Sequence, residues 1–255
     1  MGVSIFLLTA LFLVGLVLVC IEFGRRIRAR SADQKASSGL SVIDGAVFGL
    51  MGLLLAFSFS GGVSRFDTRR ELIVQETNAI GTAWLRVDLL PEGAQPGIRN
   101  DFRSYVDARL GFYNDLMTDR PKAMQELVKS QDLQKKLWAD SIAAAKQAGS
   151  PAVLTLVVGS LNEMIDITTT RLVALQTHPP LPLYLTLGLL ALGSSIVAGF
   201  DMGDAGKRQW LHTLVYAAAL TITIYTIIDL EFPRVGIIRV DRYDRALLDQ
   251  RKSMN

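Results

Sequence analysis

The chain has 255 residues, half of them hydrophobic, with a mean hydropathy of +0.30 and a formal net charge of +3. This balance is too apolar for a purely soluble protein and too polar for one made only of membrane helices, so we expect membrane helices joined to one polar domain. The mild positive charge does not favour a nucleic-acid partner, because basic residues ordinarily flank membrane segments.

The first apolar segment covers residues 3–23 and is long enough to cross a bilayer core of about 30 Å. The residues before it carry no positive charge, whereas four arginines follow it within a basic loop of residues 24–40. We therefore expect a retained membrane anchor rather than a cleaved signal peptide. Cys20 is the single cysteine of the chain and cannot form an internal disulfide, so it does not indicate a redox compartment.

A second apolar segment, residues 42–63, runs without proline into a charged segment that extends to Leu90. We predict one long helix that leaves the membrane and continues into water. Small residues recur along its apolar half at the three- and four-residue spacing by which membrane helices approach closely, namely Gly45, Gly49, Gly52, Ala56 and Ser60. Bulkier residues form another side, namely Val47, Leu50, Leu54 and Phe57.

The aqueous part is expected to cover residues 64–180. Apolar residues follow helical spacing in four segments, residues 65–90, 97–117, 121–148 and 151–176. Pro91-Glu92-Gly93 and Gly149-Ser150-Pro151 separate helices, and no segment shows the alternation of a strand. The four segments predict an antiparallel helical bundle.

A proline-rich hinge at residues 179–182 leads to the third and fourth apolar segments, residues 183–200 and 210–228. The sequence therefore predicts an all-α integral membrane protein in which four transmembrane helices carry an aqueous helical bundle between the second and third. The expected domains are residues 1–63, 64–180, 181–232 and a charged C-terminal tail, 233–255. We expect a multi-pass protein of the cell (inner) membrane.

The charges of the loops leave the orientation open. Basic residues of the short loops, including Lys35, Lys207 and Arg208, favour a cytoplasmic position for those loops and an external position for the large domain. The tail is also basic and would lie on the opposite side, which weakens this inference.

Residues that could carry enzymatic chemistry are few. The two histidines, His178 and His212, lie far apart in the sequence, and no cysteine or carboxylate stands at ligand spacing from them. No glycine-rich loop has the context of a nucleotide site, and no serine lies in a nucleophile elbow. We therefore expect no metal, no cofactor, no catalytic residue and no enzyme activity.

Charged residues near the expected membrane boundaries are the candidates for a charged ring or gate. They are Asp44, Asp229, Glu231 and Arg234. Asp44 fits either a functional charge or an interfacial residue that caps its helix. Asp229 and Glu231, beside Arg234, fit either a ring that attracts ions in a symmetric oligomer or a cluster that satisfies its own charges. Val47, Leu50, Leu54 and Phe57 likewise fit either ordinary packing or a hydrophobic constriction that gates by dewetting.

Residues 52–60, 64–73, 78–86 and 229–240 resemble the bestrophin-like bacterial membrane proteins of unassigned function, and the likeness covers most of the chain. A more distant similarity to bestrophins rests on an apolar span that runs directly into Arg65-Phe66 and Arg69. Bestrophins are pentameric anion channels whose second membrane helix lines the pore and continues into a cytosolic helical region.

The resemblance implies a homo-oligomer, a pentamer in the bestrophin pattern, with Val47, Leu50, Leu54 and Phe57 as a neck. It also implies a cytoplasmic domain, which conflicts with the charges of the short loops. No acidic cluster matches the calcium clasp of animal bestrophins, so calcium control is not implied.

Two functions from different classes follow. The first is an oligomeric channel that passes small ions, in particular anions, in contact with membrane lipid. The alternative is a non-conducting sensor or scaffold whose helical domain binds a ligand or a partner protein. A secondary transporter has less support, because the four spans show no inverted repeat and no broken helix.

Overall fold

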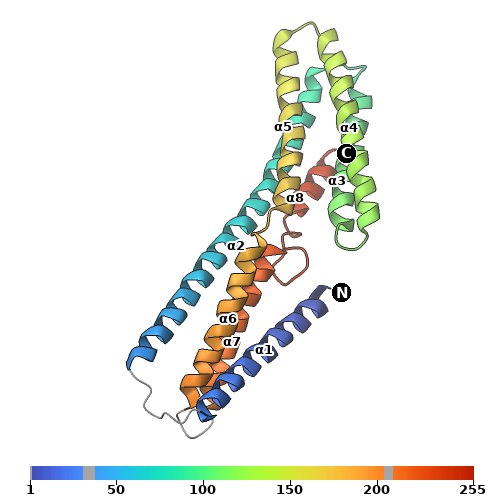
Figure 1. Cartoon of the computed structure of the whole chain (residues 1–255). Coiled ribbons are helices and arrows are strands. Elements are labelled where there is room, and N and C mark those ends of the chain that lie inside the picture. Colours follow the sequence, from blue (N-terminus) through green and yellow to red (C-terminus); the bar gives the residue numbers. More distant parts are fainter. Residues whose placement is uncertain (1, 31–37, 204–208) are drawn as a thin grey trace. The chain divides into compact units, whose positions relative to one another are not determined.

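A computed structural model gives the fold of residues 2–30, 38–203 and 209–255. All regular secondary structure in these residues is helical, which confirms the all-α fold class (Figure 1). The chain divides into two compact units, the first from residues 1–66 and 178–238 and the second from residues 67–177 and 239–255. The predicted domains were divided according to their position relative to a membrane, whereas these two units are divided according to contacts within the chain. The units therefore do not test the predicted domains.

The first unit contains the apolar helices. They are α1 (Gly2–Arg30), the first part of α2 (Ser38–Arg86), α6 (Leu181–Met202) and α7 (Trp210–Glu231). α1 continues to Arg30, whereas the sequence predicts a loop from residue 24. Glu22 stabilises its last turns by pairing with Arg25 and Arg26, three and four residues later. The predicted loop residues Lys35, Lys207 and Arg208 lie outside the described residues.

Four stretches of the described chain are long and apolar enough to cross a membrane. They are Leu8–Arg30, Val42–Leu89, Pro151–Met202 and Trp210–Glu231. The second and third have 48 and 52 residues, more than twice the roughly 20 that a helix needs to cross a bilayer. Within them, residues 42–63 and 183–200 carry no charge apart from Asp44, so these are the parts suited to lipid.

Glycines form the contact between α1 and α6. A Cβ on Gly199 would stand 1.9 Å from the carbonyl oxygen of Ile21, and a Cβ on Gly24 would stand 1.9 Å from the carbonyl oxygen of Ile196. Small residues let the backbones of membrane helices approach closely, which favours van der Waals contact along the pair. The close approach of α1 and α6 thus depends on two residues without side chains.

α2 contacts α7 through one side of its first part. The ring of Phe48 meets the ring of Tyr216 edge to face, with centroids 6.2 Å apart. Met51 lies with Leu220 and Ile224 in one buried apolar cluster. Farther along, a Cβ on Gly62 would stand 3.4 Å from the Cβ of Leu230, so the two helices are also close near the end of α7.

The second unit contains the bundle. Its elements are the rest of α2, the 3-10 turn η1 (Val87–Leu89), α3 (Gln95–Asp115), α4 (Arg120–Gln147), α5 (Pro151–Gln176) and α8 (Arg245–Ser253). Its main core comes from all five helices and includes Ile80, Phe102, Leu137, Met164 and Leu247. The sequence predicts only a charged tail over residues 233–255. In the structure Leu247 and Met254 of this segment are fully buried in that core.

Local sequence explains where the helices of the bundle begin and end. Asp119 precedes α4, and its Oδ1 accepts a hydrogen bond from the backbone N–H of Lys122 at 3.1 Å, as an N-cap does. Gly149 separates α4 from α5 with φ +69°, a conformation that suits glycine. Pro151 then opens α5, where its missing N–H costs no helical hydrogen bond.

Candidate functional site

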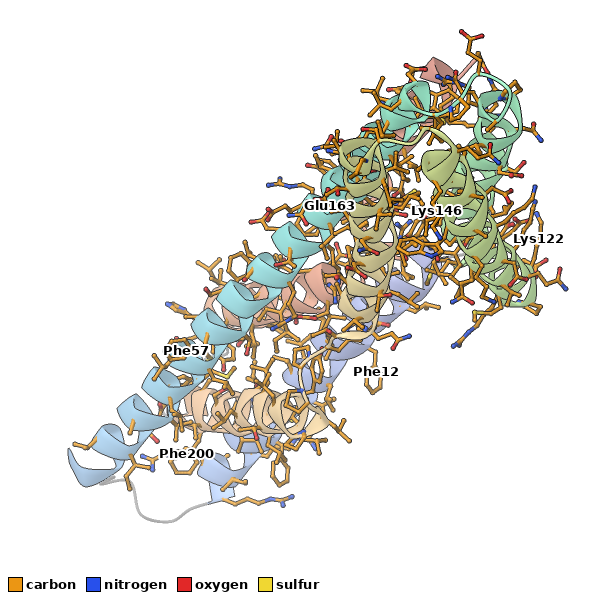
Figure 2. The ribbon with its side chains drawn as sticks, turned by 90° about the horizontal axis from the view of Figure 1, so that it is seen from above. Phe12, Phe57, Lys122, Lys146, Glu163 and Phe200 are labelled. Carbon is orange, nitrogen blue, oxygen red and sulfur yellow. The ribbon has the colours of Figure 1, made fainter. Side chains whose placement is uncertain are left out.

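The four bulky residues predicted to line a pore lie on one side of α2 in the first unit. Leu50 and Phe57 keep 54% and 68% of their surface exposed, and Val47 and Leu54 are half-buried. At about 100° per residue, the four fall within an arc of about 80° around the helix. Phe57 is labelled on α2 in Figure 2. The structure therefore brings these residues together and leaves two of them largely uncovered by the described chain.

The small residues of α2 form a second exposed side. A Cβ on Gly45, Gly49 or Gly52 would meet no atom within 4 Å, and Ala56 and Ser60 are exposed. By the same helical spacing, this side lies about 140° from the bulky one. Because the remaining side contacts α7, the first part of α2 has one side covered within the chain and two sides open.

Asp229 binds the loop that follows α7. Its Oδ2 accepts hydrogen bonds from the backbone N–H groups of Ile237 and Ile238 at 3.1 and 2.8 Å, and its Oδ1 lies 3.0 Å from the N–H of Ile237. The loop comes so close at Gly236 that a Cβ there would stand 1.3 Å from Asp229 Oδ1. This buried carboxylate therefore holds a reversal of the chain.

Glu231 is fully buried and bridges two other segments of the first unit. Its Oε1 accepts a hydrogen bond from Arg65 Nε at 2.8 Å, and the Nη2 of Arg65 donates to the same oxygen. Its Oε2 lies 3.6 Å from Nδ1 of His178. The carboxylate thus ties α2, α7 and the segment before α6 together.

The two remaining charged candidates are at different ends of the first unit's sequence. Arg234 is half-buried in the loop after α7. Asp44 is half-buried near the start of α2, 21 residues before Arg65, which corresponds to about 30 Å along a helix. Asp229, Glu231 and Arg234 are therefore grouped at one end of α7, whereas Asp44 is not part of that group.

The second unit contains a buried charge network that the sequence analysis did not identify. Glu76 of α2 accepts from Arg109 Nε at 2.6 Å through Oε1 and from Arg171 Nη1 at 2.5 Å through Oε2. Arg171 Nη2 also donates to Asp244 Oδ1 at 2.6 Å, and its guanidinium carbon lies 3.6 Å from the ring centroid of Tyr113. Two positive and two negative groups are thus neutralised together.

Electrostatics favour the ionised form of Glu76 in this network. Burial alone raises the pKa of the carboxyl, but the charges and hydrogen bonds of Arg109 and Arg171 outweigh burial and hold the pKa of Glu76 below its ordinary value. One sequence signal could have indicated the network. Glu76 and Arg109 both stand among apolar residues on the inward sides of their helices, where an unpaired charge is costly.

The described residues offer little for metal or cofactor chemistry. Within residues 2–30, 38–203 and 209–255, no three histidine, cysteine or carboxylate side chains gather in a way that could hold a metal ion. His178 stacks on Phe232, with ring centroids 4.8 Å apart. His212 is exposed on α7.

Comparisons with known proteins agree with this architecture. The family model of the bestrophin-like domain matches residues 11–243. A point variant of the bacterial bestrophin homologue from Klebsiella pneumoniae has a similar fold, with a TM-score of 0.70, 16% identity and coverage of 96% of this chain and 98% of that one. A second variant of that homologue gives a TM-score of 0.68 at 15% identity, with 96% and 99% coverage.

A crystal structure described only as that of a membrane protein is also similar, with a TM-score of 0.64, 17% identity and coverage of 98% of this chain and 99% of that one. No curated protein matches the sequence. The structural likenesses show the fold, and the family model extends over most of the chain. The chain therefore belongs to the bestrophin-like family of membrane proteins.

Proposed function

We propose that the chain is an ion channel that forms a homo-oligomer and passes small anions through a pore lined by the first part of α2. The observation that carries this proposal is the pair of open sides on that part of α2, one of small residues and one of bulky apolar residues. The family relationship supports it, because the resemblance to bestrophins implies a channel.

The two open sides have different uses in a ring of copies. The side with Gly45, Gly49 and Gly52 allows the helix of a neighbouring copy to approach closely. The side with Val47, Leu50, Leu54 and Phe57 then faces the central axis, where apolar rings narrow the pore and gate it by dewetting. Because one chain contributes one such helix, the pore needs several copies, and the resemblance to bestrophins favours five.

The charged candidates are assigned by their burial. Asp44 and Arg234 are half-buried and are proposed to contribute charge near the two ends of the pore. Asp229 and Glu231 are buried in the single chain, so we propose that they act on ions through the groups that they hold in place. The assembly is expected in the cell (inner) membrane in contact with lipid, with no metal, no cofactor and no enzymatic reaction required.

The test is the conductance of purified protein whose subunit count has been measured by mass in detergent. In planar bilayers the oligomer should pass current, and Leu54→Ala and Phe57→Ala should each change the open probability or conductance several-fold. Leu189→Ala is the matched control, because Leu189 is an apolar residue on α6 whose exposure, 70%, is close to that of Phe57. Verified oligomers that pass no current would contradict the proposal, as would a monomer.

A non-conducting scaffold is the second candidate, and one groove of the bundle favours it. The groove lies along α4 and is lined by Met124, Val128 and Leu133 beside Ser104 of α3. Met124 and Val128 are exposed. A partner protein that co-purifies with the chain and is lost in Val128→Asp, from an assembly without conductance, would favour the scaffold over the channel.

A further inference from the structure

Arg65, Glu231 and His178 form a compact charged contact in the first unit. Arg65 donates to Glu231 Oε1, and His178 Nδ1 lies 3.6 Å from the other carboxylate oxygen. The imidazole also stacks on the ring of Phe232 at an interplanar angle of 27°. The ring of His178 is therefore held beside a buried carboxylate while about a third of its side chain stays exposed.

Two consecutive glycines of α2 leave space for this contact. A Cβ on Gly61 would stand 3.2 Å from Nη1 of Arg65, so the guanidinium lies along the helix where Gly61 has no side chain. A Cβ on Gly62 would stand 3.6 Å from Glu231 Oε1. The three side chains and these glycines come from three separate segments, α2, the segment before α6 and the end of α7.

Arg65 continues the side of α2 that carries the pore candidates. It follows Val47 by 18 residues, which is about five helical turns, and follows Leu54 by 11, which leaves an offset of only about 20°. Its side chain is 29% exposed. Along this side, the apolar positions are thus followed by a cation whose charge Glu231 compensates.

The charge of the contact depends on the proton of His178. With a neutral imidazole, Arg65 and Glu231 sum to zero, and with a protonated imidazole the three groups sum to +1. Histidine ordinarily changes its charge between about pH 5 and 8. In a symmetric oligomer every copy gains this charge together.

We propose that Arg65, Glu231 and His178 act as a proton-responsive charge cluster beyond the apolar part of α2, and that protonation of His178 raises the preference of the pore for anions. This role rests on the proposed channel function. Two charged groups of the first unit act on the proton of His178. Arg65, bound to the other oxygen of Glu231, disfavours a second cation there, whereas Glu231 directly favours it.

The experiment measures reversal potentials in a salt gradient at pH 7.5 and pH 5.5. In the wild type, the anion-to-cation permeability ratio should rise about two- to fivefold on acidification, as expected for one added charge per subunit at a distance of several ångströms in a wet pore. His178→Gln should remove this response. His212→Gln is the matched control and should keep it, because His212 is exposed on α7 and is the other histidine of the chain. An unchanged pH response in His178→Gln would overturn the proposal.

A second measurement separates this cluster from the channel function. Thermal unfolding of the oligomer in detergent compares the wild type with His178→Gln. The imidazole contacts Glu231 Oε2 at 3.6 Å and stacks on Phe232 in the folded protein, so His178→Gln should lower the unfolding temperature. An unchanged unfolding temperature would overturn the cluster even in a conducting protein. A silent oligomer in which His178→Gln does lower the unfolding temperature would overturn the pore role and the proposed function alone.

Discussion

The two units of the chain are stabilised by different kinds of contact. In the first unit, the closest helix pair meets through Gly24 and Gly199, and many large apolar side chains remain exposed. In the second unit, large apolar side chains fill a common core, and a buried charge network around Glu76 joins four segments. Lipid is as apolar as the side chains, so helices in a membrane associate through close packing. In water, the hydrophobic effect favours the burial of large apolar side chains. The difference is the one expected between a membrane region and an aqueous one.

The largest expected effect concerns the second unit. Glu76→Gln removes the anion between Arg109 and Arg171 and leaves two buried cations with a single carboxylate. Loss of one partner of a buried ion pair typically costs about 3 to 5 kcal/mol. Hydrogen exchange followed by mass spectrometry should show faster exchange in α3, α4 and α5, with α1 and α6 unchanged.

Acid should weaken the same network in the wild type. Because the pKa of Glu76 is lowered in the folded state, its contribution to stability is complete above the pKa of the unfolded chain, about 4.3, and is lost as the pH falls through the lower folded value. Glu76→Gln should lack this part of the acid response. Glu71→Gln, at an exposed position of α2, serves as the control. Equal exchange in both variants would show that the network does not stabilise the bundle.

The next effect should appear in the first unit. Gly199→Ala puts a Cβ 1.9 Å from the carbonyl oxygen of Ile21, where no side chain can move aside. Overpacking of this kind costs about 1 to 3 kcal/mol, and the upper end is expected because the obstructing atom belongs to the backbone. The unfolding temperature in detergent should fall, with faster exchange in α1 and α6.

Gly193→Ala on the same helix provides the comparison for that variant. A Cβ at Gly193 would meet no atom within 4 Å, so the alanine should be neutral or slightly stabilising. If both alanine variants unfold at the wild-type temperature, α1 and α6 are not in close contact.

The smallest effect concerns one helix end of the bundle. Asp119→Ala removes the N-cap of α4 and should lower the free energy of unfolding by about 1 kcal/mol. Asp132→Ala, which removes an exposed ion pair with Lys135 within the same helix, should change it by less than about 0.5 kcal/mol. Chemical denaturation of the oligomer measures both. A larger loss in Asp132→Ala than in Asp119→Ala would contradict the role of the cap.

Much of the fold could be predicted because its determinants are local in the sequence. Apolar length marked the membrane segments, and Pro151 with the preceding glycine marked the start of α5 at the predicted residue. α1 extends past its predicted end because ion pairs with Glu22 support a helix among arginines that looked like a loop. The sequence did not predict α8, because this helix has only nine residues and lies in a charged segment. So short a helix shows little apolar periodicity, although Leu247 is fully buried.

The polar contacts were harder to predict because their partners are distant in the sequence. Glu76, Arg109 and Arg171 come from three helices, and no local pattern specifies which charges meet. The grouping of Asp229, Glu231 and Arg234 was predicted from their neighbouring positions. The hydrogen bonds that Asp229 accepts from the backbone depend on a chain reversal at Gly236, which the sequence alone did not reveal.

The glycine contact between α1 and α6 has a consequence for mutational tolerance. At most buried positions, tolerance declines gradually as the replacement differs more in size from the original residue. At Gly24 and Gly199 even the smallest replacement should not be tolerated. Every other amino acid has a Cβ, and a Cβ at either position would overlap a backbone carbonyl oxygen. A complete substitution scan should therefore find these two positions uniformly intolerant, while Gly15 and Gly188 on the same two helices accept a range of residues.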